Sequence, residues 1–250
     1  IITTDDTRKK RADFLISEMA ATVNTGITAK IFNGYLPREY FVRPKKSTFN
    51  KTYRVKKEKT EILFFIPWMV VGGADQFNLD FVRLLNKEKY NITIIATENS
   101  ENDWKQRFRE YTPYIYTLPD FLDVKNYAEF ISYIIQTRKI DICLISNSYY
   151  GYYILPWLKS QYPEIAVIDY VHMEEMYWRN GGYARTSMAM SNLIEKTYVC
   201  NDSTRRAFIS HFGRKEAEVE TLYIGVDQNK FDPQNITQGT IRSKYQIPKD

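Results

Sequence analysis

Seven short apolar runs, separated by stretches with helical spacing, constrain the fold of this chain more than any other feature. The runs are Ile62–Ile66, Ile92–Ala96, Tyr114–Leu118, Ile140–Ile145, Ile165–Tyr170, Lys196–Cys200 and Val219–Ile224. Several are apolar throughout, which is typical of strands that helices cover on both faces. The helix-like stretches between them include Asp75–Leu85, Val124–Arg138, Gly151–Lys159 and Ser203–His211. This alternation predicts an α/β fold with a doubly wound parallel sheet.

The alternation divides the chain into three parts. Residues 1–60 precede it and hold one helix-like stretch, Asp5–Val23, followed by an irregular segment with glycine and proline breakers. We expect this part to be a helical arm or linker, or the tail of a preceding domain. Residues 61–235 hold the alternation and should form the α/β domain. Residues 236–250 start a new helix-like stretch, which predicts the beginning of a further domain.

The composition is that of a folded protein from a reducing compartment. Hydrophobic residues make up 44% of the chain and charged residues 26%, which is ordinary for a globular protein. No apolar run reaches the roughly 18 residues of a transmembrane helix. The chain starts with neither a methionine nor a signal peptide, so we expect a fragment of a longer protein. Cys143 and Cys200 lie in apolar runs and are expected to be buried free thiols of a cytoplasmic protein.

Positive charge is concentrated in one segment. Residues 43–59 carry eight Lys and Arg against one Glu, a net charge of +7, so the rest of the chain sums to −2 within the total of +5. This distribution does not support a basic nucleic-acid-binding surface. Two interpretations of the segment remain. One is a solvated linker, and the other is a peripheral contact with anionic headgroups at the inner face of a membrane or with an acidic partner.

The loop after the first predicted strand has features of a ligand-binding turn, because parallel sheets bind ligands beyond the carboxyl ends of their strands. It contains Gly72, Gly73, Ala74 and Asp75 and opens a helix. Glycines can adopt a positive φ and let a ligand approach the backbone, and a helix N-terminus offers free N–H groups to a phosphate. A plain strand–helix turn would use the same residues. The spacing is not GxGxxG, so a dinucleotide fingerprint is absent.

Polar side chains follow the fourth and fifth predicted strands. Asn147 and Ser148 can bond a substrate hydroxyl or cap the next helix. His172 stands at the exit of the fifth strand, followed by Glu174 and Arg179. The aromatic and glycine content up to residue 185 predicts a mobile loop over a cleft. A lone histidine is more often structural than catalytic, so both interpretations of His172 remain.

The sixth predicted strand leads into a helix with Asp202 or Ser203 as its expected cap. Arg206, in the first turn, indicates either an anion nearby or a solvated surface cation. His211 falls at the end of this helix, where a cation complements the dipole, and we interpret it as structural. The sequence holds no Ser–His–Asp set, P-loop or EF-hand and no carboxylate cluster spaced to hold a metal.

Four motifs in this order resemble the family-4 glycosyltransferases of the GT-B fold, over roughly residues 61–250. "FFIPWMVVGGADQFNLDFVRLL" resembles their first strand, Gly-Gly-Ala-Glu loop and helix, with Asp75 where Glu is usual. "VIDYVHMEE" looks like their strand ending in histidine, and "IEKTYVCNDSTRRAFISHFG" is similar to their strand and serine-capped helix. "VETLYIGVDQNKFDP" resembles the segment that ends their N-terminal domain, with Ile224 in place of a capping Asn. "IRSKYQIPKD" looks like the first helix of their second domain.

The resemblance implies the Rossmann-like N-terminal half of a GT-B enzyme. Such enzymes transfer a sugar, with retention, from a nucleotide-sugar co-substrate to a glycan or lipid-linked acceptor in bacterial polysaccharide or glycoconjugate assembly, without a metal or other cofactor. The N-terminal domain mainly binds the acceptor, and a C-terminal domain missing from this chain holds the nucleotide. His172 would then be catalytic, facing the transferred sugar or the acceptor hydroxyl. The candidate donor- or acceptor-binding residues are Gly72, Gly73, Ala74, Asp75, Asn147, Ser148, Glu174, Arg179 and Arg206. The fragment alone should be inactive.

Two other functions stay open. The chain can be a non-catalytic α/β interaction module, or another α/β enzyme such as an epimerase or a nucleotide-binding hydrolase. A Lys/Arg pair and a Glu-x7-Glu motif downstream of Asp250 would favour the transferase. Tight nucleotide binding by this chain alone would favour the other enzymes, because the transferase places most nucleotide contacts on the missing domain.

Overall fold

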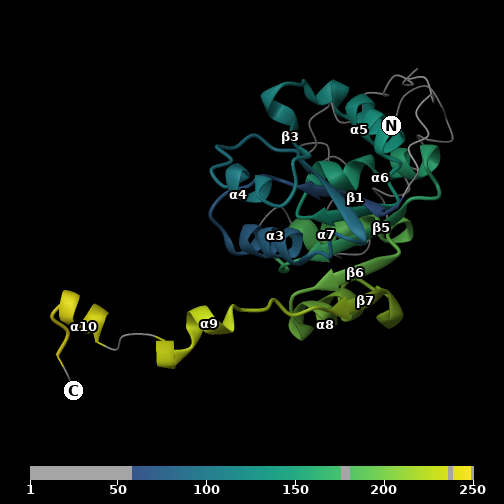
Figure 1. The fold of residues 1–250 in the computed structure, drawn as a ribbon. Coiled ribbons are helices and arrows are strands. Elements are labelled where there is room, and N and C mark those ends of the chain that lie inside the picture. Colours follow the sequence, from purple (N-terminus) through teal and green to yellow (C-terminus); the bar gives the residue numbers. More distant parts are fainter. Residues whose placement is uncertain (1–57, 176–180, 236–238, 249–250) are drawn as a thin grey trace.

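The structure, a computed structural model, describes residues 58–175, 181–235 and 239–248 (Figure 1). The strands are β1 (Thr60–Ile66), β2 (Tyr90–Ala96), β3 (Ile115–Thr117), β4 (Ile142–Ser146), β5 (Ala166–Val171), β6 (Lys196–Val199) and β7 (Val219–Thr221). The helices are α3 (Gly73–Leu84), α4 (Lys105–Arg109), α5 (Tyr127–Arg138), α6 (Tyr149–Gln161), α7 (Gly182–Ala189), α8 (Asp202–Ser210), α9 (Gln228–Phe231) and α10 (Thr240–Lys244). Short 3-10 turns cover Leu118–Asp120, Val124–Asn126, Ser191–Leu193, Glu216–Glu218 and Pro233–Asn235. The predicted helix Asp5–Val23 and residues 43–57 of the basic segment lie outside the described residues.

The seven strands form one sheet in the order β3-β2-β1-β4-β5-β6-β7, and every neighbouring pair is parallel. The chain builds outward from β1 through β2 to β3, then returns to the other side of β1 with β4 and continues to β7. The predicted doubly wound α/β fold is therefore confirmed. The order reverses between β1 and β4, and in open α/β sheets ligands bind beyond the carboxyl ends of the strands at such a point.

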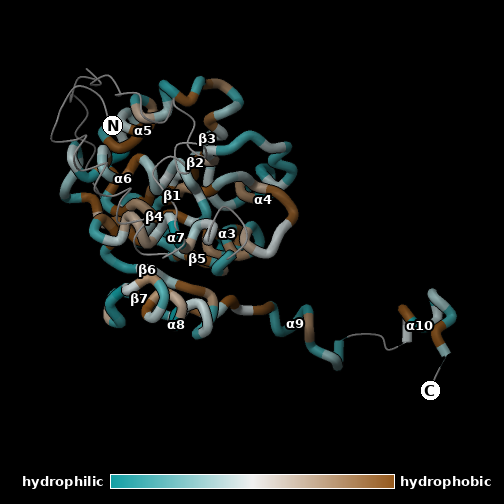
Figure 2. The backbone as a smooth tube through the Cα atoms, turned by 180° about the vertical axis from the view of Figure 1, so that it is seen from behind, coloured by the Kyte–Doolittle hydropathy of each residue, from teal (hydrophilic) through white to brown (hydrophobic). Residues whose placement is uncertain are grey.

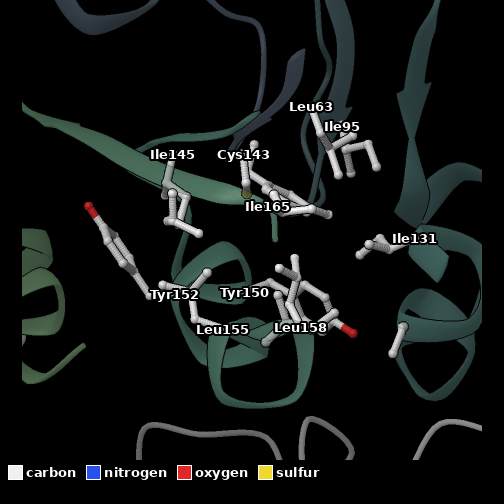
Figure 3. Close-up of a cluster of buried hydrophobic side chains, with 14 of the residues drawn as sticks. Leu63, Ile95, Ile131, Cys143, Ile145, Tyr150, Tyr152, Leu155, Leu158 and Ile165 are labelled. Atoms are coloured by element: carbon white, nitrogen blue, oxygen red, sulfur yellow. The ribbon is translucent and has the colours of Figure 1, made fainter. Parts of the chain in front are cut away.

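Continuously apolar strands supply side chains to both faces of the sheet. Leu63 and Phe65 of β1 are fully buried in a cluster with α5 and α6, part of which Figure 3 shows with Ile145, Tyr150 and Leu158. Phe64 and Ile66 are fully buried in a second cluster, which joins Leu79 of α3 and Phe108 of α4. At about 25 cal/mol per Å² of buried apolar surface, burial on both faces supplies the main stabilisation of the domain.

Several predicted boundaries differ from the structure. The last strand ends at Thr221 instead of Ile224, because the residues after it leave the sheet and are largely exposed. Helix α6 begins at Tyr149, two residues before its predicted start, and continues through Pro156. Helices α4 and α7 were not predicted. The first has five residues, and the second lies in a segment that was expected to be a loop.

The chain beyond β7 extends away from the sheet as α9 and then α10 (Figure 1). Apolar residues occur along this path, where Figure 2 shows hydrophobic stretches of the backbone tube. Those with a large exposed fraction are Leu222, Tyr223, Ile224, Val226, Phe231, Ile241, Tyr245 and Ile247. None of the helices in the described part of the chain has the length and apolar character needed to cross a membrane.

Candidate functional site

The exits of β1, β4 and β5 meet at the switch point of the sheet. Strand β1 pairs with β4, and β4 pairs with β5, with Ser146 opposite Tyr170. The loop into α3 leaves β1, Ser146 ends β4, and His172 follows the last residue of β5. The structure therefore gathers three of the predicted loops at one edge.

The loop from β1 into α3 is shaped by a buried carboxylate. Asp75 is 6% exposed, and its Oδ1 accepts a hydrogen bond from the Val70 N–H at 3.2 Å. A Cβ built on Gly72 would lie 2.8 Å from Oδ2 of Asp75, so a larger residue at position 72 would require this carboxylate to shift. Burial is the main cause that raises the pKa of Asp75 above its usual value. The Asp75 carboxylate thus holds the backbone of this loop through its bond with the Val70 N–H.

Neither of the two glycines adopts the positive φ that glycine allows. Gly72 is extended, with φ −170° and ψ 161°, and Gly73 is the first residue of α3. A Cβ on Gly73 would meet nothing within 4 Å. What distinguishes this junction is that Gly72 is the N-cap and no side chain caps the helix. The cap residue therefore offers no side chain to the first N–H groups of this 12-residue helix, where the positive end of the helix dipole lies, and the Asp75 carboxylate of the first turn bonds only its own N–H among them.

The loop after β2 fixes the loop after β1. The Met69 N–H donates to Oδ1 of Asn102 at 3.0 Å, and the Met69 carbonyl accepts from the Trp104 N–H at 3.0 Å. Asn102 has a left-handed backbone, with φ 54°, which Asn tolerates better than most residues. The approach to Gly72 is therefore held in place by backbone and side-chain bonds from a neighbouring loop.

At the exit of β4 the two predicted polar residues have different roles. Ser148 is fully buried and is the N-cap of α6, and its Oγ accepts from the Gly151 N–H at 3.0 Å. The same Oγ lies 2.8 Å from Oγ1 of Thr97. The contacts of Ser148 are therefore those of a helix cap, which was one of its two predicted roles. Asn147 is half-buried with a left-handed φ of 54°, at the turn between β4 and α6.

His172 is enclosed by side chains from three neighbouring elements. Its Nε2 lies 3.1 Å from Oγ of Ser146, and its ring packs edge-on against Phe77 and Tyr170, with centroids 5.2 Å and 4.8 Å away. Its backbone carbonyl accepts from Sγ of Cys200 at 2.5 Å. Burial lowers the pKa of His172 from 6.5 to about 4, so the ring is uncharged at neutral pH.

Phe77 and Tyr170 link this histidine to the glycine loop and to the outgoing chain. Phe77, on α3, stacks on the Tyr170 ring with centroids 3.9 Å apart. The Tyr170 hydroxyl donates to the carbonyl of Leu222 at 2.7 Å, just beyond β7. Neither residue was predicted to belong to the site, and neither was Ser146. The only signal for Ser146 was its place immediately before Asn147 at a strand end.

Several predicted residues lie elsewhere. Glu174 turns toward α8, where its Oε1 is 3.7 Å from Nδ1 of His211. Arg206 is exposed on α8, which follows β6, two strands from β4. Arg179 lies outside the described residues. The predicted mobile loop is wrong at its end: Gly182 and Arg185 belong to α7 and are buried, because the Arg185 side chain packs under Gly181.

The cap of α8 also differs from the prediction. Asn201 is the N-cap, and its Oδ1 accepts from the Thr204 N–H at 2.8 Å. Asp202 instead accepts from Oγ1 of Thr221 and from the Tyr223 hydroxyl. Cys200, next to the cap, is half-buried, whereas Cys143 is buried, and both thiols are free. Among the described residues, no group of three or more His, Cys, Asp and Glu is arranged to hold a metal ion.

Solved structures share this fold. A glycosyltransferase from Rickettsia africae has 16% sequence identity and a TM-score of 0.53, over 78% of this chain and 51% of that one. Anabaena HepE in complex with UDP has 14% identity and a TM-score of 0.53, over 75% and 50% of the two chains. Its complex with UDP and glucose has 16% identity and a TM-score of 0.51, over 74% and 50%. At these identities the likeness shows the fold alone, and the chain spans about half the length of those structures.

The sequence itself identifies the family. No curated protein matches this chain. The family model of Glycosyltransferase Family 4 matches residues 71–230, which is more than half of the chain and runs from the loop after β1 to α9. The resemblance expected from the four motifs is thereby confirmed. This chain belongs to Glycosyltransferase Family 4.

Proposed function

We propose that this chain is the acceptor-binding half of a retaining glycosyltransferase. The full protein would transfer a sugar from a nucleotide-sugar donor to a glycan or lipid-linked acceptor in bacterial polysaccharide or glycoconjugate assembly. The observation that carries the proposal is the convergence of the uncapped α3 N-terminus and His172 at the switch point of a Family 4 domain. The donor-binding domain would lie in the remainder of the protein, beyond residue 235.

The two sides of the switch point suit different parts of the substrates. The uncapped first turn of α3 suits an oxygen-rich anion such as the donor diphosphate, since its N–H groups and dipole favour negative charge. Anabaena HepE was solved with UDP and with UDP and glucose, which supports a nucleotide-sugar as the co-substrate here. The uncharged His172 suits a sugar hydroxyl. Ala74 and Asn147 flank these groups, while Asp75 and Ser148 shape the two loops.

Three further elements belong to the proposal. No metal or other cofactor takes part, as the resemblance implies. The protein is cytoplasmic, and residues 43–59 contact an anionic membrane surface. The isolated chain does not transfer sugar, because the groups that hold the nucleotide lie on the other domain.

The test is a screen of nucleotide-sugars with the full-length protein. We expect transfer with retained anomeric configuration in the NMR spectrum of the product, and activity that persists in EDTA. His172→Ala should lower kcat/KM roughly 100-fold, as expected for the loss of one substrate-facing group, whereas His211→Ala should leave it unchanged. Equal turnover in His172→Ala would remove this residue from the site. Transfer by the isolated chain would refute the division between two domains, and donor binding without turnover would indicate a non-catalytic module.

A further inference from the structure

We propose that Ser146 is a positioning residue for His172: its hydroxyl donates to Nε2, so that Nδ1 carries the ring proton and remains as an uncharged N–H donor for a ligand oxygen. The inference rests on the proposed function only where it places a ligand at His172. Its structural part concerns the tautomer and orientation of one ring, which can be measured without a substrate.

The contact is built by neighbouring strands. Ser146 is the last residue of β4 and is fully buried, and it pairs with Tyr170 of β5, two residues before His172. Its Oγ lies 3.1 Å from Nε2 of His172. Within residues 58–175, 181–235 and 239–248, Nε2 is the only hydrogen-bond partner of this hydroxyl. The pair therefore depends on the strand register.

The direction of the bond follows from the hydroxyl's one proton. A serine hydroxyl has one donor and two acceptor lone pairs. If the ring donated to Oγ, the hydroxyl proton would be buried without an acceptor, which costs about 1–3 kcal/mol. If the hydroxyl donates to Nε2, only spare lone pairs stay unused, a smaller loss. The second arrangement makes Nε2 the acceptor, and a neutral imidazole then carries its proton on Nδ1.

The surroundings hold the ring in this orientation. Phe77 and Tyr170 contact it edge-on, with interplanar angles of 80° and 61°. The Cys200 thiol donates to the His172 carbonyl, which fixes the backbone. A flip of the ring would exchange Nε2 for a carbon beside Ser146 and leave the buried hydroxyl without its partner. Among the described residues, Nδ1 has no hydrogen-bond partner, so it is free to donate to a ligand.

This tautomer limits what His172 can do. An Nδ1–H group binds an oxygen acceptor, such as a sugar hydroxyl or a diphosphate oxygen, and Nδ1 has no lone pair with which to remove a proton. The low pKa of about 4, caused by burial, agrees with a ring that stays uncharged at neutral pH. His172 would therefore orient a substrate oxygen, and a general-base role would require a different tautomer.

The test is ¹⁵N NMR of the intact protein labelled in its histidine rings. His172→Asn and His211→Asn identify the two signals of this chain by difference. We expect Nδ1 of His172 to show a protonated-type shift and Nε2 an unprotonated, hydrogen-bonded one at pH 7. Ser146→Ala should release the ring into a mixture of tautomers, and Ser146→Thr, which keeps the hydroxyl, should restore the original one. Ser160→Ala removes an exposed hydroxyl on α6 and should change nothing.

The outcomes separate the inference from the proposed function. A protonated Nε2 in the unmodified protein would overturn the inference without any variant, and so would an unchanged tautomer in a folded Ser146→Ala. In transfer assays of the full-length protein we expect about a tenfold loss of kcat/KM in Ser146→Ala, equivalent to one hydrogen bond, and recovery in Ser146→Thr. If no nucleotide-sugar is turned over by any form, the proposed function fails while the NMR result still decides the tautomer.

Discussion

Two strand–helix junctions at the same edge of the sheet are built in opposite ways. At the β6–α8 junction, Asn201 caps the helix and accepts from the Thr204 N–H. At the β1–α3 junction the cap is Gly72, which has no side chain to offer. Each region also holds one histidine: His172 is half-buried against Phe77 of α3, whereas His211 at the end of α8 is 64% exposed. At the β6–α8 junction the cap residue satisfies the helix N-terminus with its own side chain, whereas the proposed function gives that part to a ligand at the β1–α3 junction.

The largest expected effect is a dependence of the free energy of unfolding on pH that is caused by His172. The pKa of His172 is 6.5 in the unfolded chain and about 4 in the folded one, so the unfolded state binds more protons between these values. The free energy of unfolding is therefore fully retained above pH 6.5 and falls as the pH drops toward 4. Between pH 7 and pH 5 the loss should be roughly 2 kcal/mol, measurable by urea denaturation at both pH values.

The matched control is the other histidine. His172→Gln should remove this part of the pH dependence, and His211→Gln should retain it. Asp75 has the opposite effect on the pH dependence of stability, because its raised pKa makes the folded state bind more protons in the acid range. This contribution is present in both variants, so it cancels when the pH profiles of His172→Gln and His211→Gln are compared. Parallel pH profiles for the two variants would show that His172 is not the buried group described here.

Gly72→Ala should be the next largest effect, because the new Cβ would lie 2.8 Å from Oδ2 of Asp75. The buried carboxylate must move and loses its bond with the Val70 N–H. We expect the free energy of unfolding to fall by roughly 1–2 kcal/mol, as for other overpacked sites. Sugar transfer by the full-length protein should fall as well. A variant with unchanged stability would mean that the loop accepts a side chain, and the closeness of Asp75 would then not explain the glycine.

Asn201→Ala should act on stability alone. It removes the cap of α8 and should lower the free energy of unfolding by about 1 kcal/mol, the usual size for a lost N-cap. Transfer should be nearly unaffected, because Asn201 reaches His172 only indirectly, through the Cys200 Sγ to which its Nδ2 donates at 3.1 Å. Thermal or urea denaturation measures the first quantity and kcat/KM the second. A loss of transfer at equal protein concentration would contradict the division between the two junctions.

Gly73→Ala should be the smallest change in stability. A Cβ there meets nothing, and Ala favours the first turn of α3 over Gly, so the stability should rise by a few tenths of a kcal/mol. The same methyl would stand at the uncapped end of the helix. We therefore expect a higher KM for the donor together with intact stability. Unchanged kinetics would indicate that no ligand approaches this glycine.

The fold could be predicted because strands that are buried on both faces of a sheet appear in the sequence as continuous apolar runs. Each of the seven apolar runs became a strand, since a residue such as Phe64 or Phe65 must be apolar whichever face it meets. Strand ends were less certain, because Leu222 to Ile224 are as apolar as a strand but lie outside the sheet. Helix α7 was missed because Gly181 and Gly182 read as a loop, whereas both have positive φ at the start of a buried helix.

The sequence predicted which loops form the candidate site, but it predicted only some of the residues in it. The rule about strand exits selected the loops of Gly72, Asn147 and His172, and the sheet order brings them together. The contacts among side chains were not visible, because Ser146, Phe77 and Tyr170 meet His172 from separate elements. The cap of α8 was predicted at Asp202 or Ser203, one or two residues late, since Asn, Asp and Ser in succession all suit that position.

The bond between the Tyr170 hydroxyl and the Leu222 carbonyl has a mechanical consequence. Leu222 is where the chain leaves the sheet, and Tyr170 is stacked on Phe77 and touches the ring of His172. A pull on the outgoing segment is resisted by this bond and by the bond from the Leu222 N–H to the Val199 carbonyl of β6, at 2.9 Å. Because Tyr170 and Phe77 are in face contact, a shift of one displaces the other. Tyr170 thus ties the departing chain to the histidine, because one side chain both holds the Leu222 carbonyl and contacts the ring of His172.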